Sequence, residues 1–141
     1  MPDIPPRIVL DTNVLYAGLY SPSGKSHQLL RAIDEGRVRI ALSTPLLFEY
    51  EDVLRRNQAE LNLSDAEVDV VLDNLCALAD FQAVYFLWRP CLPDTKDDMV
   101  LELAVAAQVP CIVSFNAKDF GPASRFGIEV LTPKILLEEL Q

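Results

Sequence analysis

Acidic and amide side chains recur where apolar segments of this chain give way to loops or helices. Asp11 follows the apolar residues 8–10, and Glu49 lies on the edge of an amphipathic segment. A carboxylate at the end of a buried strand has lost part of its hydration, so it is normally hydrogen-bonded, paired or bound to a metal. Four further candidates lie in the second half of the chain: Asp97, Asp98, Asn116 and Asp119.

Together these groups predict a site for Mg²⁺ or Mn²⁺. Such hard ions take oxygen ligands, often only one or two carboxylates completed by water and substrate phosphates. The chemistry that such a site supports is in-line hydrolysis of a phosphodiester, because a metal activates water and stabilises charge on the leaving oxygen. A Ser or Cys nucleophile paired with His is not indicated, since the single histidine, His27, falls in a predicted amphipathic helix.

Each candidate also has a purely structural interpretation, which the sequence leaves open. Asp11 is a good N-cap for the helix that follows it, a role that Asn13 could share. Glu49 could be a solvated edge position of its helix. Asn116 and Asp119 could form an Asx turn or cap a helix.

The neighbouring acids Asp97 and Asp98 begin a predicted helix, where the helix dipole favours negative charge. Adjacent carboxylates on a helix point in different directions. Leu101 and Glu102 follow Asp98 at spacings of three and four, which places Asp98 near the buried side. We therefore assign Asp98 to the site and expect Asp97 to support it as a helix cap.

The composition limits the classes of function. The formal net charge is −9, which argues against a protein that holds nucleic acid by bulk electrostatics. A metal-binding nuclease stays possible, because a bound cation would meet the phosphate itself. Cys76, Cys91 and Cys111 are odd in number and widely spaced, so they indicate neither a metal site nor a disulfide framework.

The pattern of apolar residues predicts strands that alternate with helices. Apolar or β-branched runs predict strands at residues 8–10, 38–42, 83–87, 111–114 and 128–131. Helices are predicted between them, with Ser26, Ser43 or Thr44, and Thr132 as N-caps, and with a capping box at Ser64 and Glu67. This order favours an α/β/α sandwich with a central parallel sheet. The carboxyl ends of its strands would form one crevice that gathers the acids.

The length of 141 residues suits one domain, residues 1–141. No apolar run reaches the roughly 18 residues that a membrane span needs. Residues 1–6 lack the basic and apolar regions of a signal peptide, so the expected location is the cytoplasm.

Four motifs resemble those of PIN-domain ribonucleases. They comprise residues 11–15, residues 43–54 around Glu49, residues 97–104, and residues 113–120. The motifs occur in the family's order, and the resemblance extends over about residues 7–140. The most similar branch contains toxins of bacterial toxin–antitoxin pairs, of the VapC type. The resemblance implies the same α/β/α sandwich and Mg²⁺- or Mn²⁺-dependent cleavage of RNA.

The resemblance also implies roles for individual residues. Asp11, Glu49 and Asp98 match the three core acids of the family, and Thr12 or Asn13 and Ser43 match supporting polar positions. The fourth acid position holds Asn116, whose amide can ligate a metal but brings no charge. Asp119, three residues later, is expected to join the metal ligands. The departure at Asn116 puts two-metal catalysis in question and leaves one-metal catalysis possible.

Further expectations concern partners. The resemblance implies an RNA substrate, an antitoxin that covers the acidic crevice, and a homodimer. Candidate RNA contacts are Arg55, Arg56, Lys96 and Lys118, which are equally consistent with solvated surface. An alternative is a catalytically weakened PIN-like domain that binds RNA or protein. A phosphatase or receiver domain fits poorly, because Asn13 occupies the position where a haloacid-dehalogenase-type site needs its second Asp.

Overall fold

The computed structural model describes residues 4–84 and 95–140. Five short strands form one parallel sheet in the order β3-β2-β1-β4-β5. The strands are β1 (Arg7–Leu10), β2 (Arg39–Leu42), β3 (Ala79–Phe81), β4 (Cys111–Val113) and β5 (Glu129–Leu131). The helices are α1 (Thr12–Tyr20), α2 (Lys25–Asp34), α3 (Thr44–Arg56), α4 (Gln58–Leu61), α5 (Asp65–Leu78), α6 (Thr95–Ala107), the 3₁₀ segment η1 (Ala117–Phe126) and α7 (Pro133–Glu139).

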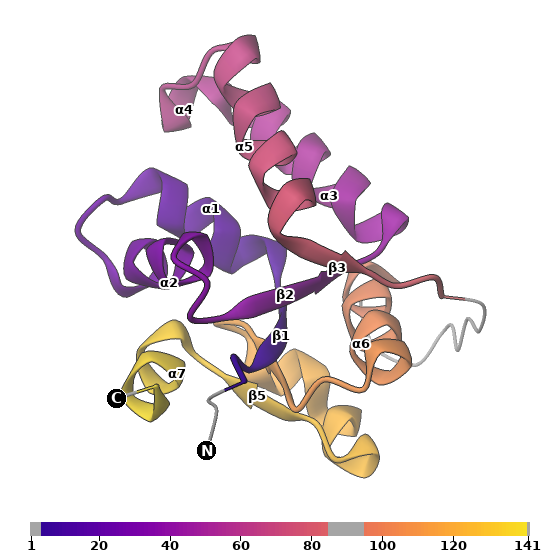
Figure 1. Cartoon of the computed structure of the whole chain (residues 1–141). Coiled ribbons are helices and arrows are strands. Elements are labelled where there is room, and N and C mark those ends of the chain that lie inside the picture. The colour runs from indigo at the N-terminus through magenta and orange to yellow at the C-terminus, as the bar shows by residue number, and fades with distance from the viewer. Residues whose placement is uncertain (1–3, 85–94, 141) are drawn as a thin grey trace.

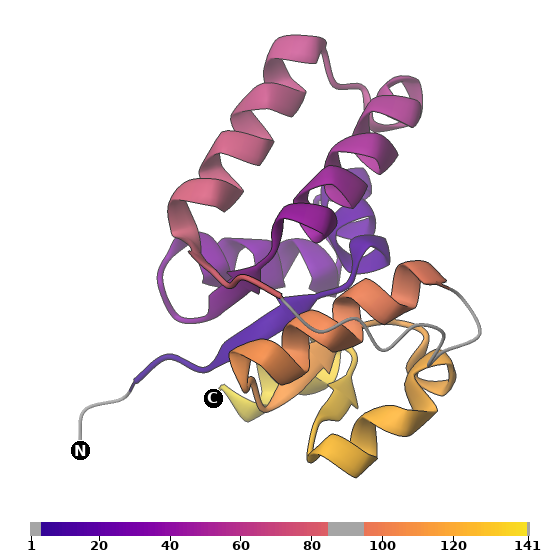
Figure 2. The same cartoon turned by 90° about the vertical axis from the view of Figure 1, so that its right-hand side faces the viewer.

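Helices cover both faces of the sheet (Figures 1 and 2). Helices α1, α2 and α7 lie on one side, and α6 with η1 lies on the other. Helices α3 and α5 pair with each other and extend away from the sheet as an arm, with α4 at its far end. The predicted α/β/α sandwich with a parallel sheet is therefore confirmed.

The core runs through the central strands. Ile8, Val9 and Leu10 of β1 are completely buried, because a parallel strand covered on both faces must be apolar on both of its sides. Parallel pairing sets Ile8 beside Ile40 of β2 and beside Cys111 of β4. This register aligns the carboxyl ends of β1 and β4, so the residues that follow these two strands meet at one edge of the sheet.

Most predicted helix starts are confirmed. Ser43 caps α3 by accepting from the backbone N–H of Leu46 at 3.3 Å. Ser64 and Glu67 form the reciprocal capping box of α5, and Thr132 caps α7.

Two local predictions were wrong. Helix α2 begins at Lys25 with Gly24 as its N-cap, so Ser26 lies buried inside the first turn instead of capping the helix. The third strand was predicted at residues 83–87, but β3 occupies Ala79–Phe81 directly after α5. Residues 85–87 lie outside the described residues, and residues 83 and 84 are not in a strand. In the part of the chain that the structure describes, no helix has the length and apolarity to cross a bilayer.

Candidate active site

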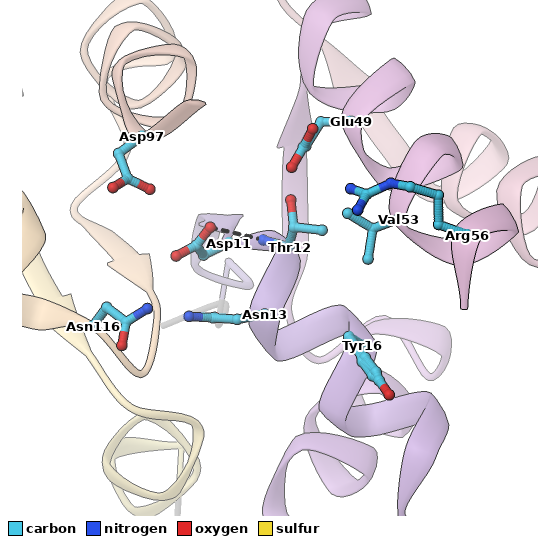
Figure 3. Close-up of a pocket in the computed structure, with 9 residues that line it drawn as sticks. All are labelled: Asp11, Thr12, Asn13, Tyr16, Glu49, Val53, Arg56, Asp97 and Asn116. Carbon is cyan, nitrogen blue, oxygen red and sulfur yellow. Dashed lines mark hydrogen bonds between the residues drawn. The ribbon is translucent and has the colours of Figure 1, made fainter. Parts of the chain in front are cut away.

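A pocket of about 310 Å³ opens where the ends of β1 and β4 meet α3 and α6 (Figure 3). Its residues come from four parts of the chain, and most of them are polar. They are Asp11, Thr12, Asn13 and Tyr16 at the start of α1, Glu49, Val53 and Arg56 on α3, Asp97 on α6, and Asn116 after β4. Asp11, Glu49 and Asp97 point toward the same space from three sides in Figure 3.

Asp11 is the N-cap of α1, as one of its two sequence-based interpretations predicted, and it also lines the pocket. One carboxylate oxygen accepts from the backbone N–H of Thr12 at 2.8 Å. The other accepts from the hydroxyl of Ser114 at 2.6 Å. The backbone N–H of Asp11 donates to Val113 at 2.9 Å. Asp11 is only 7% exposed, and these bonds fix its orientation toward the pocket.

Ser114 is a site residue that sequence reasoning missed. It is almost fully buried, donates to Asp11 and accepts from the backbone N–H of Asn116 at 3.0 Å. Its hydroxyl therefore links the first acid of the site to the loop that carries Asn116. The signal lies in the strand pairing: β1 and β4 are adjacent parallel strands that end at Leu10 and Val113, so the next residues, Asp11 and Ser114, lie side by side.

Tyr50 holds α3 against the end of β1. Its ring is completely buried, and its hydroxyl donates to the carbonyl oxygen of Leu10. Burial, assisted by the nearby charge of Asp11, raises the pKa of the Tyr50 hydroxyl well above its ordinary value, so the phenol stays protonated as a donor. Glu49 immediately precedes this anchored residue, which explains how α3 presents Glu49 to the pocket.

The structure exchanges the expected positions of the paired acids on α6. Asp97 is partly exposed and lines the pocket. Asp98 is 1% exposed and is not one of the residues that line the pocket. Sequence reasoning predicted the burial of Asp98 correctly but inferred from it that Asp98 faces the crevice. Asp98 is instead buried in the interior, as is Leu101 one turn later on α6.

The other predicted residues divide into two groups. Asn116 lies in the pocket, whereas Asp119 is partly buried one turn away and does not line it; its backbone N–H donates to the carbonyl oxygen of Asn116 at 2.9 Å. Ser43 is buried as a helix cap outside the pocket. Lys118 is exposed on η1, and the side chain of Lys96 lies outside the described part of the structure.

The donor set of the pocket fits a hard divalent cation. It offers carboxylates and amides, which are the oxygen ligands that Mg²⁺ and Mn²⁺ prefer. Within the described residues, the side-chain oxygen of Asn13 is buried and has no hydrogen-bond partner, which suits an atom that awaits a ligand. No group of three acidic, His or Cys side chains is close enough to form a complete site among these residues. Mg²⁺ usually takes only one or two carboxylates and keeps several waters.

Comparisons with known proteins bear on the family and the fold of the chain. The sequence matches the PIN domain family (PIN_3) over residues 7–118. No curated protein matches the chain. One similar solved structure is VapBC2 from Rickettsia felis bound to a DNA fragment from its promoter. The similarity has a TM-score of 0.60 at 13% identity and covers 89% of this chain and 98% of the other, so it concerns the fold.

Proposed function

The chain belongs to the PIN-domain family, and we propose that it is a Mg²⁺- or Mn²⁺-dependent endoribonuclease. The observation that carries this proposal is the convergence of Asp11, Glu49 and Asp97 on one pocket at the carboxyl edge of the sheet. Ligands in parallel α/β sheets bind at this edge.

We assign the metal to Asp11 and Asp97, with Asn13 and Asn116 as neutral oxygen donors. When bound, the cation lowers the pKa of a water and offsets charge on the leaving oxygen. The residues of the chain supply orientation: the Thr12 amide and the Ser114 hydroxyl fix both oxygens of Asp11. Glu49, across the pocket from Asp97, would accept a proton from the attacking water. The water oxygen would bond to phosphorus as the bond from phosphorus to the ribose oxygen breaks, and the released ribose oxygen would take a proton from solvent.

The direct test is cleavage of a fluorescent single-stranded RNA with Mn²⁺ present. We expect wild-type cleavage to disappear when the metal is chelated. Asp11→Asn should lower the rate at least about a hundredfold, or about 2.7 kcal/mol in the barrier. Asp73→Asn, on the exposed side of α5, is the matched control and should cleave at the wild-type rate. Equal cleavage by wild type and Asp11→Asn would exclude this nuclease site.

Asn116 favours a second candidate, a PIN domain that binds RNA or protein with weakened catalysis. It lies in the pocket at a position where an acid would add negative charge. If the amide limits metal binding, Asn116→Asp should tighten Mn²⁺ binding about tenfold, equivalent to 1.4 kcal/mol. Cleavage that appears only in Asn116→Asp would support the binding module, and cleavage by wild type would support the enzyme.

We further propose that this protein is the toxin of a toxin–antitoxin pair. The VapC-like motifs and the shared fold of the VapBC2 structure support this. The antitoxin should place a basic side chain among the carboxylates, because a buried charge needs a partner of opposite sign. Purified product of the adjacent gene should abolish cleavage at saturation, and undiminished cleavage would contradict the pairing. Homodimer formation stays a prediction, for which exposed Phe48 and Val70 on the arm offer apolar surface.

A further inference from the structure

A second pocket, of about 270 Å³, lies between α2 and α7 and has the opposite charge character to the candidate active site. The two helices pack against each other on the same side of the sheet (Figure 1). The pocket is lined by four cations, two acids and two uncharged side chains: Lys25, Arg31, Arg37, Lys134, Glu35, Glu138, Gln28 and Leu137. This is a local excess of positive charge in a chain whose net charge is −9.

Three of these cations are not neutralised by ion pairs. Arg37 pairs with Glu35 at 3.1 Å, but Lys25, Arg31 and Lys134 form no ion pair with any described residue. On the rest of the described surface most arginines are paired with acids: Arg7 and Arg39 with Asp80, Arg55 with three acids, and Arg56 with Asp52. The α2–α7 pocket therefore gathers cations that are available to an anion.

The described lining of the candidate active site holds more acids than cations. Among these described residues, Arg56 is the one cation and pairs with Asp52 at 3.0 Å, whereas three of them are carboxylates. Affinity for nucleic acid depends on the neutralisation of phosphates by Lys and Arg. Besides the phosphate at the metal, the other phosphates of a polyanionic substrate would gain affinity from cations outside the described lining of the catalytic pocket.

We propose that the α2–α7 pocket binds phosphates of the RNA backbone, at a site separate from the cleavage site. This inference rests on the proposed ribonuclease function. Among the described residues that line this pocket there is no aromatic side chain on which a base could stack. It offers instead long, flexible cations, which contact phosphates without reading the bases. The ligand class is thus the sugar–phosphate chain and not a nucleotide recognised by its base.

The separation of the two pockets makes this binding depend on RNA length. Helix α1 begins at the catalytic pocket and packs against α2, which carries part of the second pocket. The described linings of the two pockets share no residue. An RNA that occupies both must therefore extend beyond the nucleotides at the scissile bond.

The test measures RNA binding without divalent metal, so that no cleavage occurs. We expect Arg31→Gln with Lys134→Gln to weaken binding of a long single-stranded RNA about tenfold at low salt. The slope of log Kd against log salt should fall by about 1.4, the value for two lost phosphate contacts. Arg125→Gln, which removes an exposed and equally unpaired cation from η1, is the matched control and should change neither quantity. Thermal unfolding midpoints verify that the variants are folded.

Cleavage of a trinucleotide, which is too short to reach the second pocket, distinguishes a failure of this proposal from a failure of the proposed function. The double variant should cleave a trinucleotide at the wild-type rate but require more of the long RNA for half-maximal rate. Two results would overturn the phosphate site, whether or not the protein cleaves RNA. One is an unchanged affinity of the double variant for long RNA, and the other is an equal loss of affinity in Arg125→Gln. In a third result, the affinities for inorganic phosphate and for long RNA fall equally when Arg31 and Lys134 are replaced, with no higher affinity for longer RNA. That result would show that the site binds free phosphate and would overturn the RNA assignment. Loss of cleavage in Asp11→Asn bears only on the nuclease.

Discussion

Asp11 and Asp80 are two aspartates of the same parallel sheet, and their environments differ in kind. Asp11 accepts hydrogen bonds from neutral donors, the Thr12 amide and the Ser114 hydroxyl. Asp80, in β3, pairs with Arg39 on the neighbouring strand and with Arg7 at 3.6 Å. Hydrogen bonding to Arg39 lowers the pKa of the Asp80 carboxyl.

We propose that the difference separates an acid that stabilises the fold from one that serves a ligand. An arginine partner cancels the charge of a carboxylate, as it does for Asp80. A neutral donor orients a carboxylate without cancelling its charge. At the ends of β1 and β4, the Thr12 amide and the Ser114 hydroxyl hold Asp11, and the Asn116 amide holds Ser114 in turn.

The comparison of Asp11 with Asp80 is tested most strongly by the affinity of the protein for Mn²⁺. Asp11→Asn should weaken Mn²⁺ binding at least about tenfold, or 1.4 kcal/mol, because it removes a charged ligand. Asp80→Asn should leave Mn²⁺ affinity unchanged, since Asp80 does not line the pocket. Calorimetric titration of both variants with Mn²⁺ provides the measurement. An equal loss of affinity in the two would show that net charge and not the site controls binding.

A second pair of acids sharpens the same distinction within one helix. Asp97→Asn should lower the cleavage rate about tenfold or more and change stability by less than about 0.5 kcal/mol, because Asp97 is a partly exposed pocket residue. Asp98→Asn alters a nearly fully buried side chain and should cost about 1–3 kcal/mol of unfolding free energy. Cleavage assays and urea unfolding of both variants provide the measurements. A loss of cleavage in Asp98→Asn and a loss of stability in Asp97→Asn would identify Asp98 as the pocket acid.

Ser114→Ala tests whether the neutral donor orients Asp11. The variant leaves one oxygen of a nearly buried carboxylate and the backbone N–H of Asn116 without their hydroxyl partner. We expect a loss of about 1–2 kcal/mol in unfolding free energy and a severalfold lower affinity for Mn²⁺. Ser124→Ala, at an exposed hydroxyl on η1, is the control. If the two substitutions have the same effect, Ser114 does not position the acid.

The sequence predicted the architecture well because hydrophobic periodicity dominates in a sheet covered on both faces. Four of the five strands lie within one or two residues of their predicted positions. The third strand was missed because β3 follows α5 without an intervening glycine or proline and contains Ala79, Asp80 and Phe81, which carry no β-branched signal. Strand pairing and the Arg39–Asp80 contact define it, and neither is local in sequence.

Individual residues of the candidate site could be predicted only where a single strand or helix determines which way the side chain points. Asp11 and Glu49 were found from a strand end and a helix stripe. The choice between Asp97 and Asp98 depends on the rotation of α6, and this helix has apolar residues on nearly every side. Ser114 was overlooked because its role comes from pairing between β1 and β4, which lie about a hundred residues apart in the chain.

The smallest effect is expected for Asp80 itself, as a dependence of stability on pH. Because Arg39 lowers the pKa of Asp80 in the folded state, the ion pair stabilises the fold above the unfolded-state pKa of about 3.9. This contribution is lost as the pH falls through the lower folded-state pKa. The pair is partly exposed, so it should contribute less than about 1 kcal/mol and weaken in high salt. Urea unfolding should therefore show wild type more stable than Asp80→Asn at pH 7 and a smaller difference at lower pH; a constant difference would contradict the pairing.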